Sequence, residues 1–172
     1  MTVSIGNQPV TALSIGNTPV TKVWIGNVLY WQSGVDINLA PGDFTPAGAA
    51  AKGWAPSTYL VQWYTSYVRL FKELNSISFP GYINNIDVPV QVGASYTFRA
   101  YMIAEFGSGS PGVRIRVGDA QGQLDSSQRT TVGWVEVTFT AREELMYFGV
   151  ESYNATNTNS QCDISQVQLI KN

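Results

Sequence analysis

The sequence predicts an all-β protein, in which a short arm of repeated strand-turn units precedes a β-sandwich or barrel domain. Two observations predict this organisation. From residue 36 onward, stretches of alternating apolar and polar residues are separated by clusters rich in glycine, proline and asparagine, a pattern typical of many short strands. Residues 3–31 repeat with a period of ten residues. No segment reads as a convincing helix, so we expect a fold built from sheets alone.

The alternation predicts which side of each strand faces the core. In the segment 95–102 (SYTFRAYM), the apolar and aromatic positions fall on one side and Thr97, Arg99 and Tyr101 on the other. The segments 113–117 and 135–139 alternate in the same way, with valine, isoleucine and phenylalanine opposite arginine, glutamate and threonine. We expect the last strands around 146–150 and 167–169, and place the domain at residues 36–172.

The arm, residues 1–33, consists of three similar units: VSIGNQPVTA, LSIGNTPVTK and VWIGNVLYW. Each unit begins with a short apolar strand. Gly-Asn follows and predicts a turn, because both residues tolerate a positive φ. The proline that follows in the first two units suits the start of a strand or an unpaired edge.

Units of ten residues are too short to enclose a core of their own, so they need neighbours that bury their apolar face. Those neighbours could be other copies of the chain around a threefold axis, or a surface on another protein. The alternative is a three-stranded meander packed on the main domain. The residues expected to anchor or oligomerise the arm are its repeated apolar and aromatic positions: Ile5, Val10, Ile15, Val20, Trp24, Ile25, Tyr30 and Trp31.

Composition excludes several classes of function. The net charge of −2 leaves no basic stripe for nucleic acid. No stretch approaches about 20 consecutive apolar residues, so no membrane span is expected. Met1 leads straight into the alternating pattern, so no signal peptide is expected either. The chain has no histidine and one cysteine, Cys162, which removes the commonest general base and any disulfide. We therefore expect a protein that is not an enzyme.

The arm resembles the N-terminal segments of bacteriophage virion proteins, in which short IGN-x-PVTKVWIGN-type repeats end in an aromatic pair, here Tyr30-Trp31. The resemblance covers residues 3–31 only. It implies that the arm attaches the chain to a virus particle, with other virion proteins and other copies of the chain, in a homotrimer, as partners.

The domain resembles carbohydrate-binding modules of families 4 and 9 at four places in the right order. These are INLAPGDFTPAGAAAKGWAP, VPVQVGASYTFRAYMIAE, TTVGWVEVTFTA and CDISQVQLIKN. The resemblance implies a jelly-roll β-sandwich of two antiparallel sheets, with Trp54 and Trp134 in its core. It also implies a structural calcium, for which Asp43 and Asp163 are the candidate ligands, although Thr45 replaces an acidic residue of the family's pattern. The alternative is that these two aspartates are ordinary solvated or capping carboxylates. No other cofactor is expected.

Two groups of residues suit carbohydrate chemistry, in which flat aromatic rings meet sugar C–H groups and polar side chains meet hydroxyls. The first is the aromatic stretch 59–67 (YLVQWYTSY), with Gln62, Trp63 and Tyr67 as candidates. Strand alternation puts Trp63 and Tyr64 on opposite sides, so at most one of them faces a ligand. The second candidate is a face carrying Arg99, Tyr101, Arg114 and Arg116, if their two strands pair; a solvated face with salt bridges to Glu136 or Asp119 is the alternative.

These observations lead to one functional hypothesis and one alternative. The hypothesis is a non-catalytic bacteriophage virion protein, a capsid decoration or a head or tail fibre on the virion surface. Its arm attaches to the particle, and its jelly roll projects outward and contacts host-surface glycans with added avidity. The alternative is a stand-alone carbohydrate-binding module of a polysaccharide-degrading system. A small lyase or hydrolase is disfavoured by the missing histidines.

Overall fold

The computed structural model describes residues 37–58, 60–72, 80–107, 111–154 and 159–172, together with six short strands of the arm. The chain divides into two compact units, residues 1–36 and 37–172. Each unit is described by itself.

The arm forms three separate two-stranded antiparallel hairpins, one for each repeat. Their strands are β1 (Ser4–Ile5), β2 (Gln8–Pro9), β3 (Leu13–Ile15), β4 (Thr18–Val20), β5 (Lys22–Ile25) and β6 (Val28–Gln32). In each hairpin the repeated isoleucine pairs with the residue three positions later, so the two residues between them are the Gly-Asn of the repeat. The described strands of the arm thus pair within each repeat. Of the expected anchoring residues, Val10 lies outside the described residues and the others lie on the hairpin strands.

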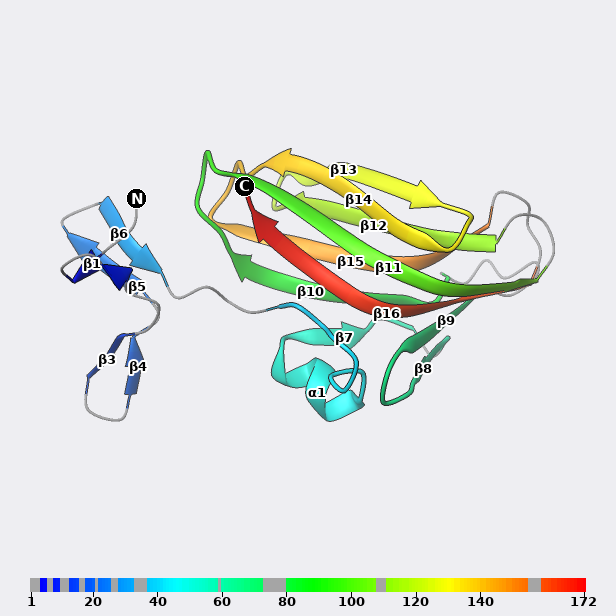
Figure 1. The fold of residues 1–172 in the computed structure, drawn as a ribbon. Helices are drawn as coiled ribbons and strands as arrows, with labels where there is room; N and C mark the ends of the chain where they lie inside the picture. The colour runs from blue at the N-terminus through cyan, green and yellow to red at the C-terminus, as the bar shows by residue number, and fades with distance from the viewer. Residues whose placement is uncertain are drawn as a thin grey trace. The chain divides into compact units, whose positions relative to one another are not determined.

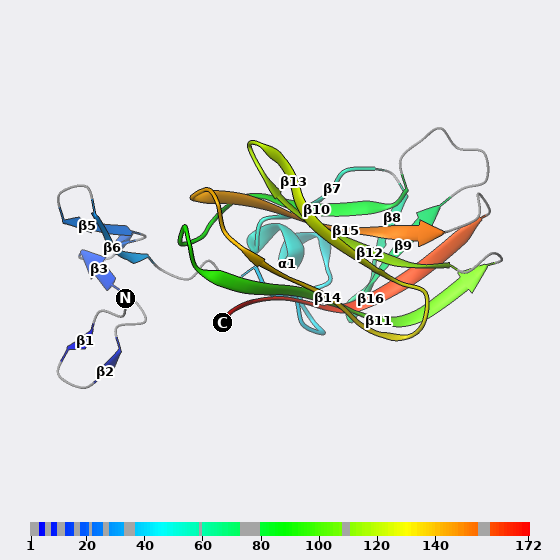
Figure 2. The ribbon, with the colours of Figure 1, turned by 90° about the horizontal axis from the view of Figure 1, so that it is seen from above.

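The domain is a jelly-roll β-sandwich of two antiparallel five-stranded sheets (Figures 1 and 2). The β15 sheet, named for its central strand, has the order β13-β12-β15-β10-β7, and the β16 sheet has the order β14-β11-β16-β9-β8. The strands are β7 (Trp54–Pro56), β8 (Val61–Trp63), β9 (Val68–Lys72), β10 (Tyr82–Pro89), β11 (Ser95–Gly107), β12 (Pro111–Asp119), β13 (Gly122–Arg129), β14 (Gly133–Thr140), β15 (Leu145–Asn154) and β16 (Ser160–Lys171).

The core lies between the sheets and is filled by the apolar positions that strand alternation selects. Phe98, Ile115 and Phe148 are fully buried, and all three lie on expected core sides. Two rings pack against each other across the core, Phe98 from the β16 sheet and Phe148 from the β15 sheet, with their centroids 5.0 Å apart. The expected landmark Trp54 belongs to this core at 1 % exposure, and its indole Nε1 donates to the carbonyl of Ile37 at 2.6 Å.

The domain also contains a helix that the sequence reading missed. Helix α1 (Pro46–Ala51) closes the core beside β7 and buries Ala49. Thr45 is its N-cap, with its hydroxyl accepting from the Gly48 amide at 3.0 Å, and Pro46 occupies the first turn. Both are ordinary helix-start signals, but they open a helix of only six residues, too short to show an apolar period.

No helix among the described residues is long and apolar enough to cross a membrane.

Candidate functional site

The outer face of the β15 sheet, turned away from the core, gathers tyrosines and charged groups from three neighbouring strands. On β15, Met146, Phe148 and Val150 fill the core, so Tyr147, Glu151 and Tyr153 point to the other side. Residues that pair directly across an antiparallel ladder share a side of the sheet. The pairings Arg114↔Glu151 and Tyr82↔Glu151 therefore add Arg114 from β12 and Tyr82 from β10 to this face.

Arg116, Asn84, Gln123, Ser126 and Gln128 join it by the same register. We call this surface the tyrosine face and define it by Tyr82, Arg114, Arg116, Tyr147, Glu151 and Tyr153. Its tyrosines and arginines are partly exposed, so ligands can reach them.

Two tyrosines lie over glycines, which leaves their rings resting on the sheet. A Cβ at Gly149 would come within 2.1 Å of the Tyr82 hydroxyl oxygen and 2.4 Å of its ring carbon Cε2. A Cβ at Gly118 would come within 2.2 Å of the Tyr147 ring carbon Cζ. Real side chains do not approach so closely, so only glycine leaves room for the rings at these positions. A ring held down on a sheet offers a broad apolar surface to a ligand.

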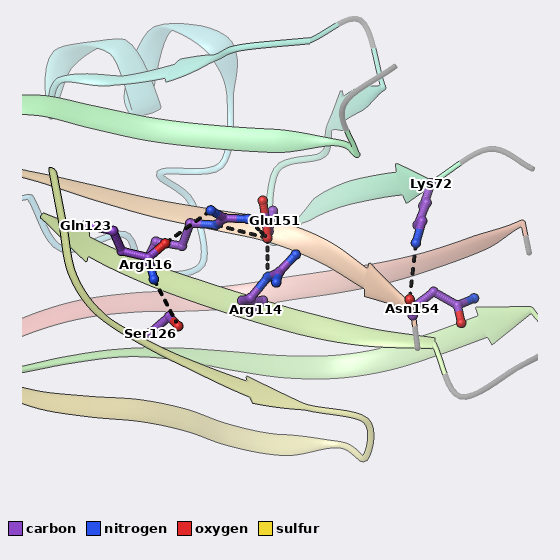
Figure 3. A network of polar contacts seen from close by, with 7 residues as sticks. All are labelled: Lys72, Arg114, Arg116, Gln123, Ser126, Glu151 and Asn154. Carbon is purple, nitrogen blue, oxygen red and sulfur yellow. Dashed lines mark hydrogen bonds and ion pairs between the residues drawn. The ribbon is translucent and has the colours of Figure 1, made fainter. Parts of the chain in front are cut away.

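A polar network crosses the same face (Figure 3). Glu151 is 5 % exposed, and its Oε1 accepts hydrogen bonds from the Nε atoms of both Arg114 and Arg116 and from Nη2 of Arg116 at 2.8 Å. Arg116 also donates through Nη1 to Gln123 at 3.1 Å. The remaining tyrosine, Tyr153, lies beneath the Arg114 guanidinium, 5.1 Å from its Cζ. The side chains of this face are therefore fixed in position by one another.

Tyr82 remains a neutral phenol at physiological pH. Burial, and then the negative charge of Glu151, raise its pKa to about 12. A neutral phenol both donates and accepts hydrogen bonds. Beside it, Asn84 accepts from the Ser57 hydroxyl at 2.9 Å through Oδ1. The face thus combines aromatic rings, amide groups, hydroxyl groups and the guanidinium groups of two arginines. Such a combination can hold a flat ligand with many hydroxyl groups.

The structure corrects the expectation that Arg99, Tyr101, Arg114 and Arg116 share one sheet. Arg99 and Tyr101 lie on β11 in the β16 sheet, whereas the other two lie on β12 in the β15 sheet. The chain crosses between layers after β11, so these consecutive strands do not pair. Among the described residues, neither Glu136 nor Asp119 binds Arg114 or Arg116. These two arginines donate to Glu151, and Asp119 accepts from Nε of Arg142 at 2.9 Å.

The expectation that Trp134 lies in the core is also wrong. Trp134 pairs with Tyr101 on the outer face of the β16 sheet and is only partly buried. The Arg99 guanidinium covers its ring at 4.3 Å, and the Tyr101 ring meets it edge-on at 5.1 Å. Arg99 also donates to Gln168 at 2.9 Å, which holds its guanidinium over the indole.

The aromatic stretch 59–67 divides between core and surface. Trp63 is partly buried and packs against the core, whereas Tyr64 is 38 % exposed. Tyr67 is stacked on Tyr64 at 4.4 Å, and Arg69 lies against both rings. Gln62 accepts from the Tyr64 hydroxyl through its Oε1 at 3.1 Å and lines a hollow of about 460 Å³.

The expected calcium ligands have other partners. Asp163 is 4 % exposed and takes both bonds of a bidentate pair with Arg69, each at 2.7 Å. Asp43 accepts from the amide of Ala40 at 3.0 Å and lies 3.7 Å from the Lys52 ammonium. Among the described residues, no group of three or more acidic, histidine or cysteine side chains could hold a metal ion. These two aspartates therefore stabilise the loops and strands around them.

Sequence reasoning missed most of the tyrosine face. Tyr82, Tyr147, Glu151 and Tyr153 were not candidates, although the alternation of LMYFGVESYN over residues 145–154 puts three of them on one side. The further signal was the pair of glycines at 118 and 149, within strands rich in large residues. Glycine inside a strand often marks a close approach by another group.

The comparisons with known proteins support the fold. No family model matches the chain, and no curated protein sequence matches it. A solved family 4 carbohydrate-binding module aligns with a TM-score of 0.55 at 17 % identity, over 70 % of this chain and 96 % of that one. The N-terminal cellulose-binding domain of Cellulomonas fimi β-1,4-glucanase C aligns with a TM-score of 0.52 at 17 % identity, over 81 % of this chain and 97 % of that domain.

An arabinose-bound GH51 α-L-arabinofuranosidase also aligns, with a TM-score of 0.55 at 14 % identity, over 80 % of this chain but only 27 % of the enzyme. At such identities the likeness is one of fold. The domain therefore has the jelly-roll fold of carbohydrate-binding modules, as the four sequence landmarks implied.

Proposed function

We propose that the domain is a non-catalytic carbohydrate-binding module and that a saccharide lies across its tyrosine face. The observation that carries this proposal is the pair of tyrosine rings, Tyr82 and Tyr147, resting on glycines beside a fixed polar network. Pyranose rings present patches of C–H groups to aromatic surfaces and hydroxyls to polar side chains. The fold of the solved binding modules supports the same reading.

Binding without hydrolysis follows from the state of the acidic group on this face. Glycoside hydrolysis ordinarily uses two carboxyl groups on either side of the scissile bond. Glu151 is the carboxylate that the strand register assigns to the tyrosine face, and two arginines occupy its Oε1. Because both guanidinium groups donate to this oxygen, it is not free to reach a glycosidic bond.

The experiment is a glycan array followed by calorimetric titration of the best ligand, with two matched variants. Tyr147→Ala removes a ring from the tyrosine face, and Tyr101→Ala removes a partly buried tyrosine from the outer face of the other sheet. We expect Tyr147→Ala to weaken binding about 3–10-fold, the equivalent of one lost aromatic contact. Tyr101→Ala should bind as the wild type does. Equal loss in both variants, or loss in Tyr101→Ala alone, would reject the tyrosine face as the site.

We also propose that the arm attaches this module to a larger assembly, the surface of a virion, and joins three copies of the chain. Three separate hairpins of two strands each support an intermolecular role, since isolated two-stranded hairpins are marginally stable in water. The resemblance of the repeats to phage virion segments supplies the kind of assembly. On a particle, several weak saccharide sites would act together and bind far more tightly than one.

A further inference from the structure

The polar network on the tyrosine face carries a positive charge in excess, although the chain as a whole has a net charge of −2. The charged side chains that meet in this network are Arg114, Arg116 and Glu151. Two guanidinium groups therefore share one carboxylate, which leaves one unbalanced positive charge. Burial of Glu151 and the partial burial of both arginines weaken screening of that charge by solvent.

The two arginines are engaged to different degrees (Figure 3). All three nitrogens of the Arg116 guanidinium donate, Nε and Nη2 to Glu151 and Nη1 to Gln123. Arg114 donates through Nε alone, also to Glu151. Among the described residues, neither Nη group of Arg114 has a hydrogen-bond acceptor. The guanidinium of Arg116 is thus fully used in holding the face together, whereas the two Nη groups of Arg114 can donate to a ligand.

The free end of Arg114 is held in place. Its Nε bond to Glu151 fixes one edge of the guanidinium plane, and the Tyr153 ring supports the group from one side at 5.1 Å. Its side chain is 32 % exposed, so a ligand on the face can reach it. A fixed guanidinium fork matches the two oxygens of a carboxylate, to which it binds through two parallel N–H···O bonds.

We infer that the saccharide bound here is acidic, and that its carboxylate pairs with the free Nη groups of Arg114 while its rings lie on the tyrosines. The ligand class is a uronic-acid or sialic-acid glycan. This inference rests on the proposed function, because it assigns the substrate class of the same face. It also gives Arg116 and Glu151 a positioning role, since they set the place and the charge of Arg114 without contacting the carboxylate.

The test uses the full chain and matched pairs of polysaccharides. Polygalacturonate, hyaluronan, alginate and polysialic acid are each compared with a carboxyl-reduced counterpart, which keeps the sugar backbone and removes the charge. We expect at least one acidic member to bind about tenfold or more tightly than its reduced form, with a preference that shrinks as salt rises. In Arg114→Met, the preference for the acidic member over its reduced form should disappear, so that the two forms bind with equal affinity.

Two further variants keep the result interpretable. Arg114→Lys retains the charge without the planar fork and should give an intermediate preference. Arg99→Met removes an arginine from the outer face of the other sheet and should leave the preference intact. Thermal melting verifies that each variant is folded.

The outcomes separate this inference from the proposed function. Binding of reduced or other neutral glycans without preference for the acid, or a preference that survives in Arg114→Met, would overturn the acidic-ligand inference alone. If the wild type binds no acidic, reduced or arrayed glycan, the proposed function fails together with it.

Discussion

The contrast between two tryptophans tests how the sandwich is held together. Trp54 is 1 % exposed, lies 6.3 Å from the Phe98 ring and donates to the carbonyl of Ile37, which is itself fully buried. Truncating such a ring to alanine costs about 3–5 kcal/mol. Leaving a buried carbonyl without its donor adds about 1–3 kcal/mol. The total approaches the whole stability of a domain, which is about 5–15 kcal/mol.

Trp134 should behave differently, because its ring packs against Arg99 and Tyr101 on the outer face of the β16 sheet. A cation–π contact at a solvent-accessible site contributes about 0.5–1 kcal/mol, and an edge-to-face pair contributes about 0.5–1.5 kcal/mol. We therefore expect Trp134→Ala to cost about 1–2.5 kcal/mol, a fall of roughly 3–10 °C in melting temperature for a domain of this size. Trp54→Ala should fail to fold or melt far lower.

The assay is urea unfolding and thermal melting of both variants beside the wild type. Trp54→Phe is the matched control: it keeps an aromatic ring near Phe98 but loses the N–H donor, so its stability should fall between those of wild type and Trp54→Ala. Equal destabilisation by Trp54→Ala and Trp134→Ala would refute the assignment of one ring to the core and the other to the surface.

Three other perturbations have expected outcomes. Gly118→Ala should push the Tyr147 ring off the sheet and weaken saccharide binding about 3–10-fold with little change in melting temperature; unchanged affinity would contradict the role of this glycine. Asp119 has its pKa lowered chiefly by hydrogen bonds from Arg142, so it stabilises the fold above its unfolded pKa of about 3.9, and this contribution is lost as pH falls through the lower folded value. Asp119→Asn should therefore have a lower free energy of unfolding in urea than wild type at pH 7, and this difference should shrink below about pH 4. A difference that stays constant with pH would argue against the ion pair. Residues 37–172 alone should melt cooperatively as a monomer while the full chain has the mass of a trimer by light scattering, and an identical oligomer for both would remove the arm from assembly.

Strand alternation predicted the core of the domain well, because burial on one side of a strand imposes a period of two on the sequence. The residues Val113, Ile115 and Val117 lie in the core as expected, with arginines between them on the other side. The same rule would have placed Trp134 correctly. Val135 and Val137 are core residues, so their neighbour at 134 must face outward. The family resemblance put it in the core, against the local pattern.

The site could not be predicted to the same extent, because alternation gives the side of a strand but not its neighbours. Arg99 and Arg114 are on consecutive strands, yet the connection between β11 and β12 passes from one sheet to the other. Only the three-dimensional pairing brings Tyr82 beside Glu151, 69 positions away along the sequence. Similarly, the ion pair of Arg69 with Asp163 joins segments whose separation in the sequence hides their contact. In this structure Arg69 is thus the partner of Asp163.

The central claim is that a saccharide binds across the tyrosine face. The most direct measurement is an NMR titration of the isotope-labelled protein with the tightest glycan from the array, followed through backbone amide shifts. We expect the largest changes at Tyr82, Arg114, Tyr147 and Glu151 and at their neighbours on β10, β12 and β15, with small changes throughout the β16 sheet. Changes concentrated on Arg99, Trp134 and the rest of the β16 sheet would contradict the claim and move the site to the opposite side of the sandwich.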